Sequence, residues 1–241
     1  MISLFTGNPG HVAARFQASR LSRVAFFFIW RRRMSRRDIK GKIREAARVL
    51  FNEHGYNNVT MRDIAEAAGI SVGNLTYHYK RKELLMEAAI VERRQQYKIP
   101  LTPATLEELN EIFTYMAHYN IENAYYFRHY TQIAQISPRV HQIQIDTVRD
   151  IVYVFKSAFR EFQQTDIMRP ELYEGQMTFL AYSIMNPTSF WIYQREVIVE
   201  AKSKPEFEIL CCVWGMLTPM LTQKGLEVFE KRVKPLNAKL Q

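Results

Sequence analysis

The sequence predicts an all-α protein, in which a small N-terminal domain of helix-turn-helix type precedes a larger helical domain. Apolar residues recur at spacings of three and four along most of the chain, whereas strand alternation and hairpin turn signals do not occur. Of the 241 residues 47% are hydrophobic and only nine are Gly and nine Pro, which is typical of a helix-rich globular protein. The third observation is the stretch 60–82, which combines two helix starts and a tight turn.

Residues 60–82 (TMRDIAEAAGISVGNLTYHYKRK) predict two short helices joined by a turn. Thr60 and Asp63 have the spacing of a capping box at the start of the first helix. Gly69 follows where the chain must turn sharply, since glycine accepts a positive φ, and Ser71 can cap the second helix. The residues expected to face inward are Ile64, Ala65, Ala68, Leu75 and Tyr79. The second helix of such a pair can enter the major groove of DNA.

Two further helices flank this pair. The first, over residues 38–54, follows from regular apolar spacing and is followed by Gly55, a fitting residue just past a helix end. The second runs from about Lys80 to Tyr97 and is ended by Pro100. The apolar residues of the first are Ile39, Ile43, Ala47, Leu50 and Phe51, and those of the second are Leu84, Leu85, Ala88 and Val91.

The net charge of +9 is concentrated at the N-terminal end of the chain. Residues 1–40 carry nine Lys and Arg against one acidic residue, residues 41–98 carry ten against seven, and residues 99–241 carry fourteen against sixteen. The basic excess therefore lies around the helix-turn-helix, where the release of counterions from DNA would favour binding.

Residues 1–33 are expected to be an N-terminal extension, disordered or not part of the native start. The apolar run 24–30 (VAFFFIW) is too short to span a bilayer, and it leads into arginines instead of a cleavage site. One interpretation is that Met34 is the biological start and the preceding residues are upstream sequence read in frame. The alternatives are a basic anchor at a membrane surface or a basic arm that contacts DNA.

The stretch IREAARVLFNEHGYNNVTMRDIAEAAGISVGNLTYHYKRKELL resembles the DNA-binding domain of the TetR family of bacterial transcriptional regulators. The resemblance covers about residues 38–90, and we expect residues 34–98 to form the DNA-binding domain. Thr76 stands where the family commonly has tyrosine, which would drop a phosphate contact. Tyr79 stands where phenylalanine is common, so its hydroxyl needs a partner. The markers of the resemblance are Phe51 to Gly55, Thr60, Ile64-Ala65, Ala68-Gly69, Gly73 and Tyr77-His78-Tyr79-Lys80.

The resemblance implies DNA contacts from both short helices, in roles that the side-chain chemistry supports. Arg62 would read a guanine edge, Asn74 an adenine or another base edge, and Val72 a thymine methyl group. Gly73 would let the helix approach the DNA closely. The candidate contacts to phosphate are Thr60, Tyr77, His78 and Lys82, and Thr76 completes the set.

Each of these residues also has an ordinary structural role open to it. Thr60 could serve as a helix cap alone, and Tyr77 could belong to the core. His78 could be solvated or packed. The basic run 80–82 could be a solvated face, which is the usual meaning of such a run.

Residues 99–241 resemble the second domain of the family in layout, which implies a helical ligand-binding and dimerisation domain. Ser137-Pro138 and Thr102-Pro103 each place a capping residue before a proline, as at a helix start. Pro187 and Pro219 are expected to kink or interrupt their helices. The predicted helices lie near residues 103–119, 121–136, 138–164, 171–200 and 205–233.

A homodimer is implied by the resemblance, through the last two long helices packing as a four-helix bundle. The physics of helix-turn-helix proteins agrees, because two reading heads must lie roughly 34 Å apart on one face of the DNA. The apolar residues available for the dimer, or alternatively for the monomer core, are Phe179, Tyr182, Trp191, Tyr193, Leu210, Val213, Trp214 and Leu217.

Residues 113–130 are rich in aromatic side chains, which could line a ligand pocket or simply fill the core. Arg128, if it faced inward, would select an acidic ligand. His118, Glu122 and His129 are too scattered to predict a metal site, and we expect neither metal nor cofactor. The candidate ligand-binding residues are Tyr115, His118, Tyr119, Tyr126, Arg128, Tyr130 and Tyr182.

The sequence favours a ligand-responsive DNA-binding regulator, most simply a repressor whose dimer binds a palindromic operator and is released by a small molecule. No catalytic motif is found, so we expect no enzymatic activity. Cys211 and Cys212 suggest buried structural thiols without a disulfide framework, and the cytoplasm is the simplest compartment. The alternatives are a membrane-associated helical interaction protein anchored through residues 1–33, and a helical enzyme whose N-terminal helices bind protein partners.

Overall fold

The computed structural model describes residues 38–96, 103–198 and 203–240, which are helical and contain no β-strand beyond one isolated bridge between Met168 and Leu221. The predicted all-α class is confirmed. The chain divides into two compact units, residues 1–42 and residues 43–241. In the first unit, the Asp38 carboxylate accepts a hydrogen bond from the backbone N–H of Gly41 at 2.9 Å. The predictions for residues 1–33 and for a helix end at 97–100 lie outside the described residues.

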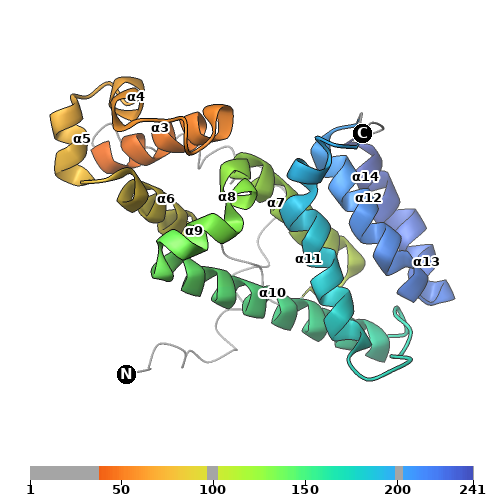
Figure 1. The fold of residues 1–241 in the computed structure, drawn as a ribbon. Coiled ribbons are helices and arrows are strands. Elements are labelled where there is room, and N and C mark those ends of the chain that lie inside the picture. The colour runs from red at the N-terminus through yellow and green to blue at the C-terminus, as the bar shows by residue number, and fades with distance from the viewer. Residues whose placement is uncertain (1–37, 97–102, 199–202, 241) are drawn as a thin grey trace. The chain divides into compact units, whose positions relative to one another are not determined.

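Four helices make up the described N-terminal residues 38–96: α3 (Ile39–His54), α4 (Met61–Ala67), α5 (Val72–His78) and α6 (Lys82–Gln96). Figure 1 shows α4 and α5 next to each other, and α6 follows them in the chain. Gly55 and Gly69 have φ values of 78° and 68°, so both turns use the backbone freedom of glycine, as predicted. The helix-turn-helix expected over residues 60–82 is therefore present.

The core beneath these helices also includes residues from the larger domain. Leu75 is fully buried and Tyr79 is 8% exposed, as the spacing predicts, while Ile39 is 40% exposed. Tyr125 packs against Phe51, with ring centroids 5.4 Å apart. The buried residues of this cluster are Ile43, Ala47, Phe51, Tyr56, Val59, Ile64, Ala65, Leu75, Tyr79, Leu85, Met86, Ile90, Tyr125, Tyr126, Ile133 and Val140. Because the cluster runs on past residue 98, the domain boundary expected there stays a prediction.

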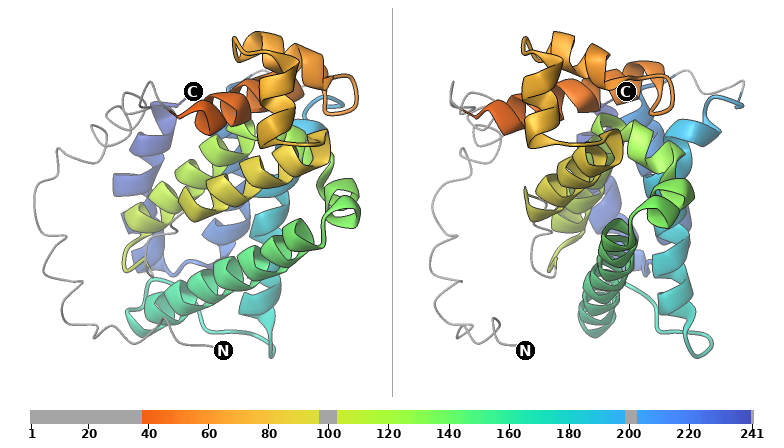
Figure 2. Two further views of the ribbon diagram at one scale, coloured as in Figure 1. Left: turned by 90° about the vertical axis from the view of Figure 1, so that its left-hand side faces the viewer. Right: turned by 60° about the vertical axis from the view of Figure 1, so that its left-hand side comes forward.

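The second part of the chain is a set of helices in which α7, α10, α11 and α12 pack together, and α10 also contacts α6 (Figure 2). Its elements are α7 (Leu106–Glu122), α8 (Ala124–Arg128), α9 (Tyr130–Ile136), α10 (Pro138–Gln164), α11 (Gln176–Gln194), α12 (Pro205–Leu217), the 3₁₀ helix η1 (Thr218–Met220), α13 (Gln223–Val228), the π-helical segment η2 (Phe229–Val233) and α14 (Lys234–Ala238). None of the helices within the described ranges is both long and apolar enough to cross a membrane.

Two of the predicted helix starts and breaks, at Ser137 and at Pro219, were correct, and the interruption expected at Pro187 was not. Ser137 caps α10 by accepting a hydrogen bond from the N–H of Val140 at 3.2 Å, with Pro138 in the first turn. Pro219 ends the regular helix, since α12 stops at Leu217 and a 3₁₀ turn follows. Pro187 does not interrupt α11, which continues on both sides of it.

Other boundaries were wrong, for local reasons. The helix expected from residue 103 begins at Leu106, because Thr105 and not Thr102 is its cap. The helix expected over 121–136 is two short helices, because the backbone of His129 leaves helical geometry at φ −112° and ψ 23°. The helix expected over 171–200 spans α11 alone, since Gly175 at φ 86° precedes its first turn and α11 ends at Gln194.

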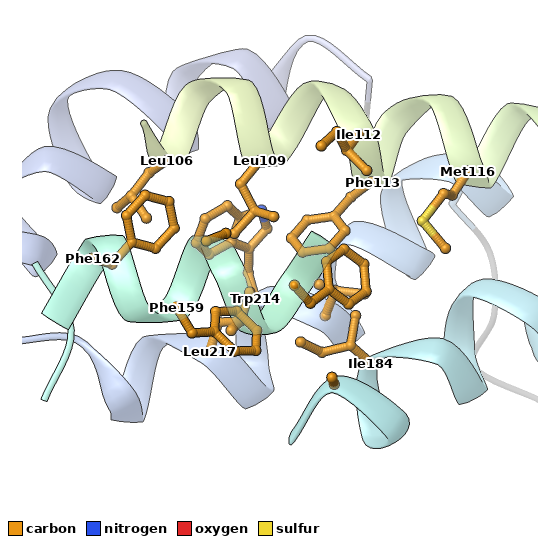
Figure 3. Packing of buried hydrophobic residues seen from close by; sticks show 14 of the residues in the cluster. Leu106, Leu109, Ile112, Phe113, Met116, Phe159, Phe162, Ile184, Trp214 and Leu217 are labelled. Atoms are coloured by element: carbon orange, nitrogen blue, oxygen red, sulfur yellow. The ribbon is translucent and has the colours of Figure 1, made fainter. Parts of the chain in front are cut away.

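The core of the larger domain takes four of the residues that were candidates for a dimer face. Leu210, Val213, Trp214 and Leu217 are at most 3% exposed. Figure 3 shows Trp214 and Leu217 among side chains of α7 and α10. The indole N–H of Trp214 donates to the side-chain oxygen of Asn110 at 2.7 Å, so this polar pair is satisfied inside the core. By contrast Phe179, Tyr182 and Tyr193 are 62%, 46% and 60% exposed, and Trp191 is half-buried. The prediction of buried thiols is wrong for Cys211, which is exposed, while Cys212 is half-buried.

Candidate nucleic-acid interface and ligand pocket

The first short helix begins with a complete capping box. The N–H of Asp63 donates to the Thr60 hydroxyl oxygen at 3.2 Å, while the Asp63 carboxylate accepts from the Thr60 N–H at 2.8 Å and from its hydroxyl at 2.7 Å. These hydrogen bonds to Thr60 hold the pKa of Asp63 below its usual range. The cap is therefore confirmed, and the hydroxyl proton of Thr60 is already donated inside the chain.

The outward face of the two helices carries the side chains that were expected to read DNA. Arg62 and Asn74 are exposed, and Val72 is 42% exposed. Tyr77 is 83% exposed, which excludes the core role, and its ring meets that of His78 edge-on with centroids 5.2 Å apart. A Cβ added at Gly73 would meet only the Ser71 hydroxyl, at 3.9 Å, and Gly73 itself is exposed.

Two predicted contacts use their polar groups inside the protein. The Thr76 hydroxyl donates to backbone oxygens of the preceding turn, at 3.0 Å from Val72 and 3.1 Å from Gly73. The Lys82 ammonium donates to the backbone oxygens of Tyr56 and Val59 at 2.7 and 2.8 Å, and it lies 4.3 Å from the Tyr56 ring centroid. Burial lowers the pKa of Lys82 and raises that of Tyr56 to about 12. Lys82 thus holds the loop between α3 and α4, and only one of its three N–H donors remains.

Hydrogen bonds connect α3 and α6, the helices on either side of α4 and α5, to the larger domain, and sequence reasoning missed them. Asn52 of α3 donates to the backbone oxygen of Glu122 at 2.7 Å and accepts from the N–H of Tyr125 at 2.9 Å. Arg48 donates to the same Glu122 oxygen at 2.6 Å. A second contact joins α6 to α10, where the Ser137 hydroxyl donates to the Glu87 carboxylate at 2.7 Å. No local pattern marks such contacts, since their partners are about 50 to 70 residues apart.

A pocket of about 500 Å³ lies against one face of α10, and it includes only two of the predicted ligand residues, Tyr130 and Tyr182. Its size is within the range of small-molecule sites. Gln144 is buried there and donates to the backbone oxygen of Tyr130 at 2.9 Å. The full lining is Tyr130, His141, Gln144, Ile145, Val148, Arg149, Val152 and Tyr182. The six residues from α10 recur at spacings of three and four, but their mixed polarity gave no signal in the sequence.

The other predicted ligand residues lie elsewhere. Arg128 is exposed and forms an ion pair with Glu196, so it does not face inward as an acidic ligand would require. His118 lies 3.5 Å from Glu206. Tyr126 belongs to the buried cluster under the reading helices, where burial raises its pKa. Tyr115 and Tyr119 pack partly buried against the core of the larger domain. Among the described residues, no three His, Cys, Asp or Glu side chains gather as a metal site would require.

Comparison with known proteins relates part of the chain to one family of regulators. The model for bacterial regulatory proteins of the tetR family matches residues 43–89, which include α4, α5 and most of α6. The probable HTH-type transcriptional regulator YttP of Bacillus subtilis (strain 168) is 27% identical over 131 residues. By these matches the chain is similar to TetR-family regulators, and residues 43–89 match the model of that family. The match to YttP covers 51% of this chain and 63% of YttP, which is less than two thirds of that relative.

Solved structures of TetR-family proteins have the same fold. A TetR-family transcriptional regulator from Marinobacter aquaeolei VT8 superposes with a TM-score of 0.69 at 20% identity, over 84% of this chain and 98% of that chain. The complex of SmeT with triclosan superposes with a TM-score of 0.51 at 19% identity, over 77% of this chain and 92% of that chain. SmeT is described as the repressor of a Stenotrophomonas maltophilia multidrug efflux pump. At these identities the likeness establishes the TetR fold alone.

Proposed function

We propose that this chain is a DNA-binding transcriptional regulator of the TetR family, most simply a repressor. The observation that carries the proposal is the outward face of the helix-turn-helix, where Arg62, Asn74 and Tyr77 are exposed above a closed apolar core. An exposed tyrosine and arginine, together with a glycine at which even an added Cβ would meet nothing closer than 3.9 Å, suit a surface that approaches a duplex. The positive charge of the N-terminal half supports the same reading. Arg62 and Asn74 would read base edges, and Tyr77 and His78 would contact phosphate.

The regulator would bind a palindromic operator as a homodimer. Two reading heads are needed about one helical turn of DNA apart, so a two-fold interface must hold two chains. The aromatic side chains Phe179, Tyr182 and Tyr193 stand exposed at spacings of three and eleven along α11, which leaves an apolar face on one side of that helix. A second copy of α11 would bury this face. Phe179→Asp should convert the dimer to monomers in analytical ultracentrifugation, whereas the exposed Tyr153→Asp on α10 should not.

Release of the DNA would follow when a small molecule occupies the pocket beside α10. The pocket shares Tyr130 with the ring network that reaches Tyr126 at a centroid distance of 5.4 Å. The backbone N–H of the adjacent residue, Tyr125, donates a hydrogen bond to the side chain of Asn52 on α3. A ligand that favours a different placement of α9 and α10 would thereby bias α3 and α6 away from the DNA-binding geometry, by no more than its difference in affinity for the two states.

The pocket can be tested with N-phenyl-1-naphthylamine, an uncharged apolar dye whose fluorescence rises on binding. Val148→Trp should weaken dye binding because the indole would occupy part of the pocket and cover its apolar lining, while Tyr153→Trp, on the same helix but outside the lining, should leave it unchanged. Equal dye binding by both variants would place the apolar binding surface outside this pocket.

DNA binding is tested by fluorescence anisotropy on a duplex taken from immediately upstream of the gene that encodes the chain. A scrambled duplex of the same length and two salt concentrations separate specific from general electrostatic binding. We expect a preference for the upstream duplex that is lost in Tyr77→Ala and Arg62→Ala. Weak binding that is equal on both duplexes and unchanged by the two substitutions would refute the proposed function as a DNA-binding regulator.

A further inference from the structure

Helix α5, the second helix of the helix-turn-helix, ends just before Tyr79, a buried tyrosine whose hydroxyl group is hydrogen-bonded to Arg44. Tyr79 follows the last residue of α5, is 8% exposed, and its N–H donates to the backbone oxygen of Leu75 at 2.8 Å. Its hydroxyl accepts a hydrogen bond from Nη1 of Arg44 at 2.9 Å. The ring therefore fixes the end of α5 in the core, while the hydroxyl connects it to α3.

The same guanidinium holds α6. Arg44 is only 15% exposed in its side chain, and its Nε and Nη2 atoms both donate to the carboxylate of Glu92. Burial disfavours its charge, but the hydrogen bonds to Glu92 and Tyr79 outweigh that cost, so the pKa of Arg44 lies above its ordinary value. A planar guanidinium with three donors in use has little freedom, because moving toward one partner breaks the bond to another.

We propose that Arg44 is a positioning residue that sets the orientation of α5 for reading DNA by tying the end of that helix to α6. The inference rests on the proposed function. Since α6 also contacts α10 through Glu87 and Ser137, a displacement of α6 would carry Glu92 with it and either draw Arg44 away from Tyr79 or take Tyr79 along. The clamp of Arg44, Glu92 and Tyr79 thus passes a movement of α6 directly to the reading helix.

The hydroxyl group of Tyr79 allows this role to be separated from simple packing. A phenylalanine ring would fill the same buried space, so Tyr79→Phe removes the hydrogen bond and little else. Glu92→Gln keeps an acceptor but removes the charge that fixes the guanidinium. Tyr153→Phe, at a side chain that is 70% exposed, is the matched control for loss of a hydroxyl.

The test measures the affinity of the full chain for the upstream duplex and for the scrambled duplex, together with Tm. A hydrogen bond to a charged group is strong enough to change an equilibrium about tenfold, so Tyr79→Phe should bind the upstream duplex about tenfold more weakly. Binding to the scrambled duplex should change less than about twofold, because phosphate contacts do not need one fixed helix orientation. The double variant with Glu92→Gln should bind no more weakly than the weaker single variant, since both changes disable one clamp.

Two results would overturn the positioning role. One is an unchanged preference of Tyr79→Phe for the upstream duplex, when the wild-type chain has that preference. The other is an equal loss on both duplexes accompanied by a lower Tm, which would make Tyr79 a stability residue only. A wild-type chain that does not distinguish the two duplexes would overturn the proposed function and the clamp together.

Discussion

Replacing Lys82 by Met separates the two roles that this residue could have at the start of α6. Methionine keeps an unbranched side chain that can lie over the Tyr56 ring, but it removes the ammonium that donates to the backbone oxygens of Tyr56 and Val59 at 2.7 and 2.8 Å. Hydrogen bonds from charged donors contribute about 1.5 to 3 kcal/mol each, and partial exposure of this side chain reduces that value, so we expect a loss of about 2 kcal/mol in total.

A loss of that size would lower Tm by about 4 to 8 °C in a chain of this length. The assay is thermal unfolding followed by circular dichroism, paired with anisotropy on the scrambled duplex over a range of salt. If Lys82 holds the loop, the salt dependence of binding should stay close to that of the wild-type chain. If Lys82 is mainly a phosphate contact, the slope of log K against log salt should fall by about 0.9 for each reading head, with Tm nearly unchanged. Lys80→Met, the same change at an exposed lysine, controls for the lost charge. A Tm equal to that of Lys80→Met would show that the Lys82 ammonium does not stabilise this loop.

Three further predictions concern stability. Because the pKa of Asp63 is lowered in the folded chain, its capping box stabilises the fold fully above about pH 4, the ordinary pKa of Asp. This stabilisation is lost as pH falls through the lower pKa of the folded state. The difference in Tm between the wild-type chain and Asp63→Asn should therefore be largest at pH 7 and disappear in acid. Gly225→Ala should lose about 2 kcal/mol in urea unfolding, because a Cβ there would lie 2.1 Å from the backbone oxygen of Ile167, and an unchanged midpoint would contradict that clash. Asn110→Ala should cost about 2 kcal/mol in the same assay, because it leaves the buried indole N–H of Trp214 without its acceptor.

Local chemistry made the reading helices predictable. Thr60, Asp63, Gly69 and Ser71 determine their caps and turn within four residues of the position they affect, and each has the predicted role or conformation. The need for a partner to the Tyr79 hydroxyl was also predicted, and Arg44 meets it. Short-range interactions of this kind depend on spacing, which a sequence displays directly.

The larger domain was less predictable because its features depend on contacts between distant residues. The apolar pattern of α12 could not distinguish core from dimer face, and the answer for Trp214 came from α7, where Asn110 accepts its N–H. The aromatic run 113–130 was expected to line a pocket or to fill the core. In the structure Tyr125 and Tyr126 belong to the buried cluster that includes Leu75 and Tyr79, and Tyr130 alone of these three lines the pocket. The helix break at His129 separates Tyr125 and Tyr126 from Tyr130, and the sequence did not predict it because no glycine or proline lies there.

Hydroxyl-radical footprinting of the upstream duplex shows whether two copies of this helix-turn-helix read adjacent half-sites on DNA. We expect two protected segments related by two-fold symmetry, with centres separated by about one helical turn of 10 to 10.5 base pairs or a multiple of it, and no such pattern with Tyr77→Ala. Uniform protection along the duplex, or a single segment without symmetry, would contradict binding by two such heads.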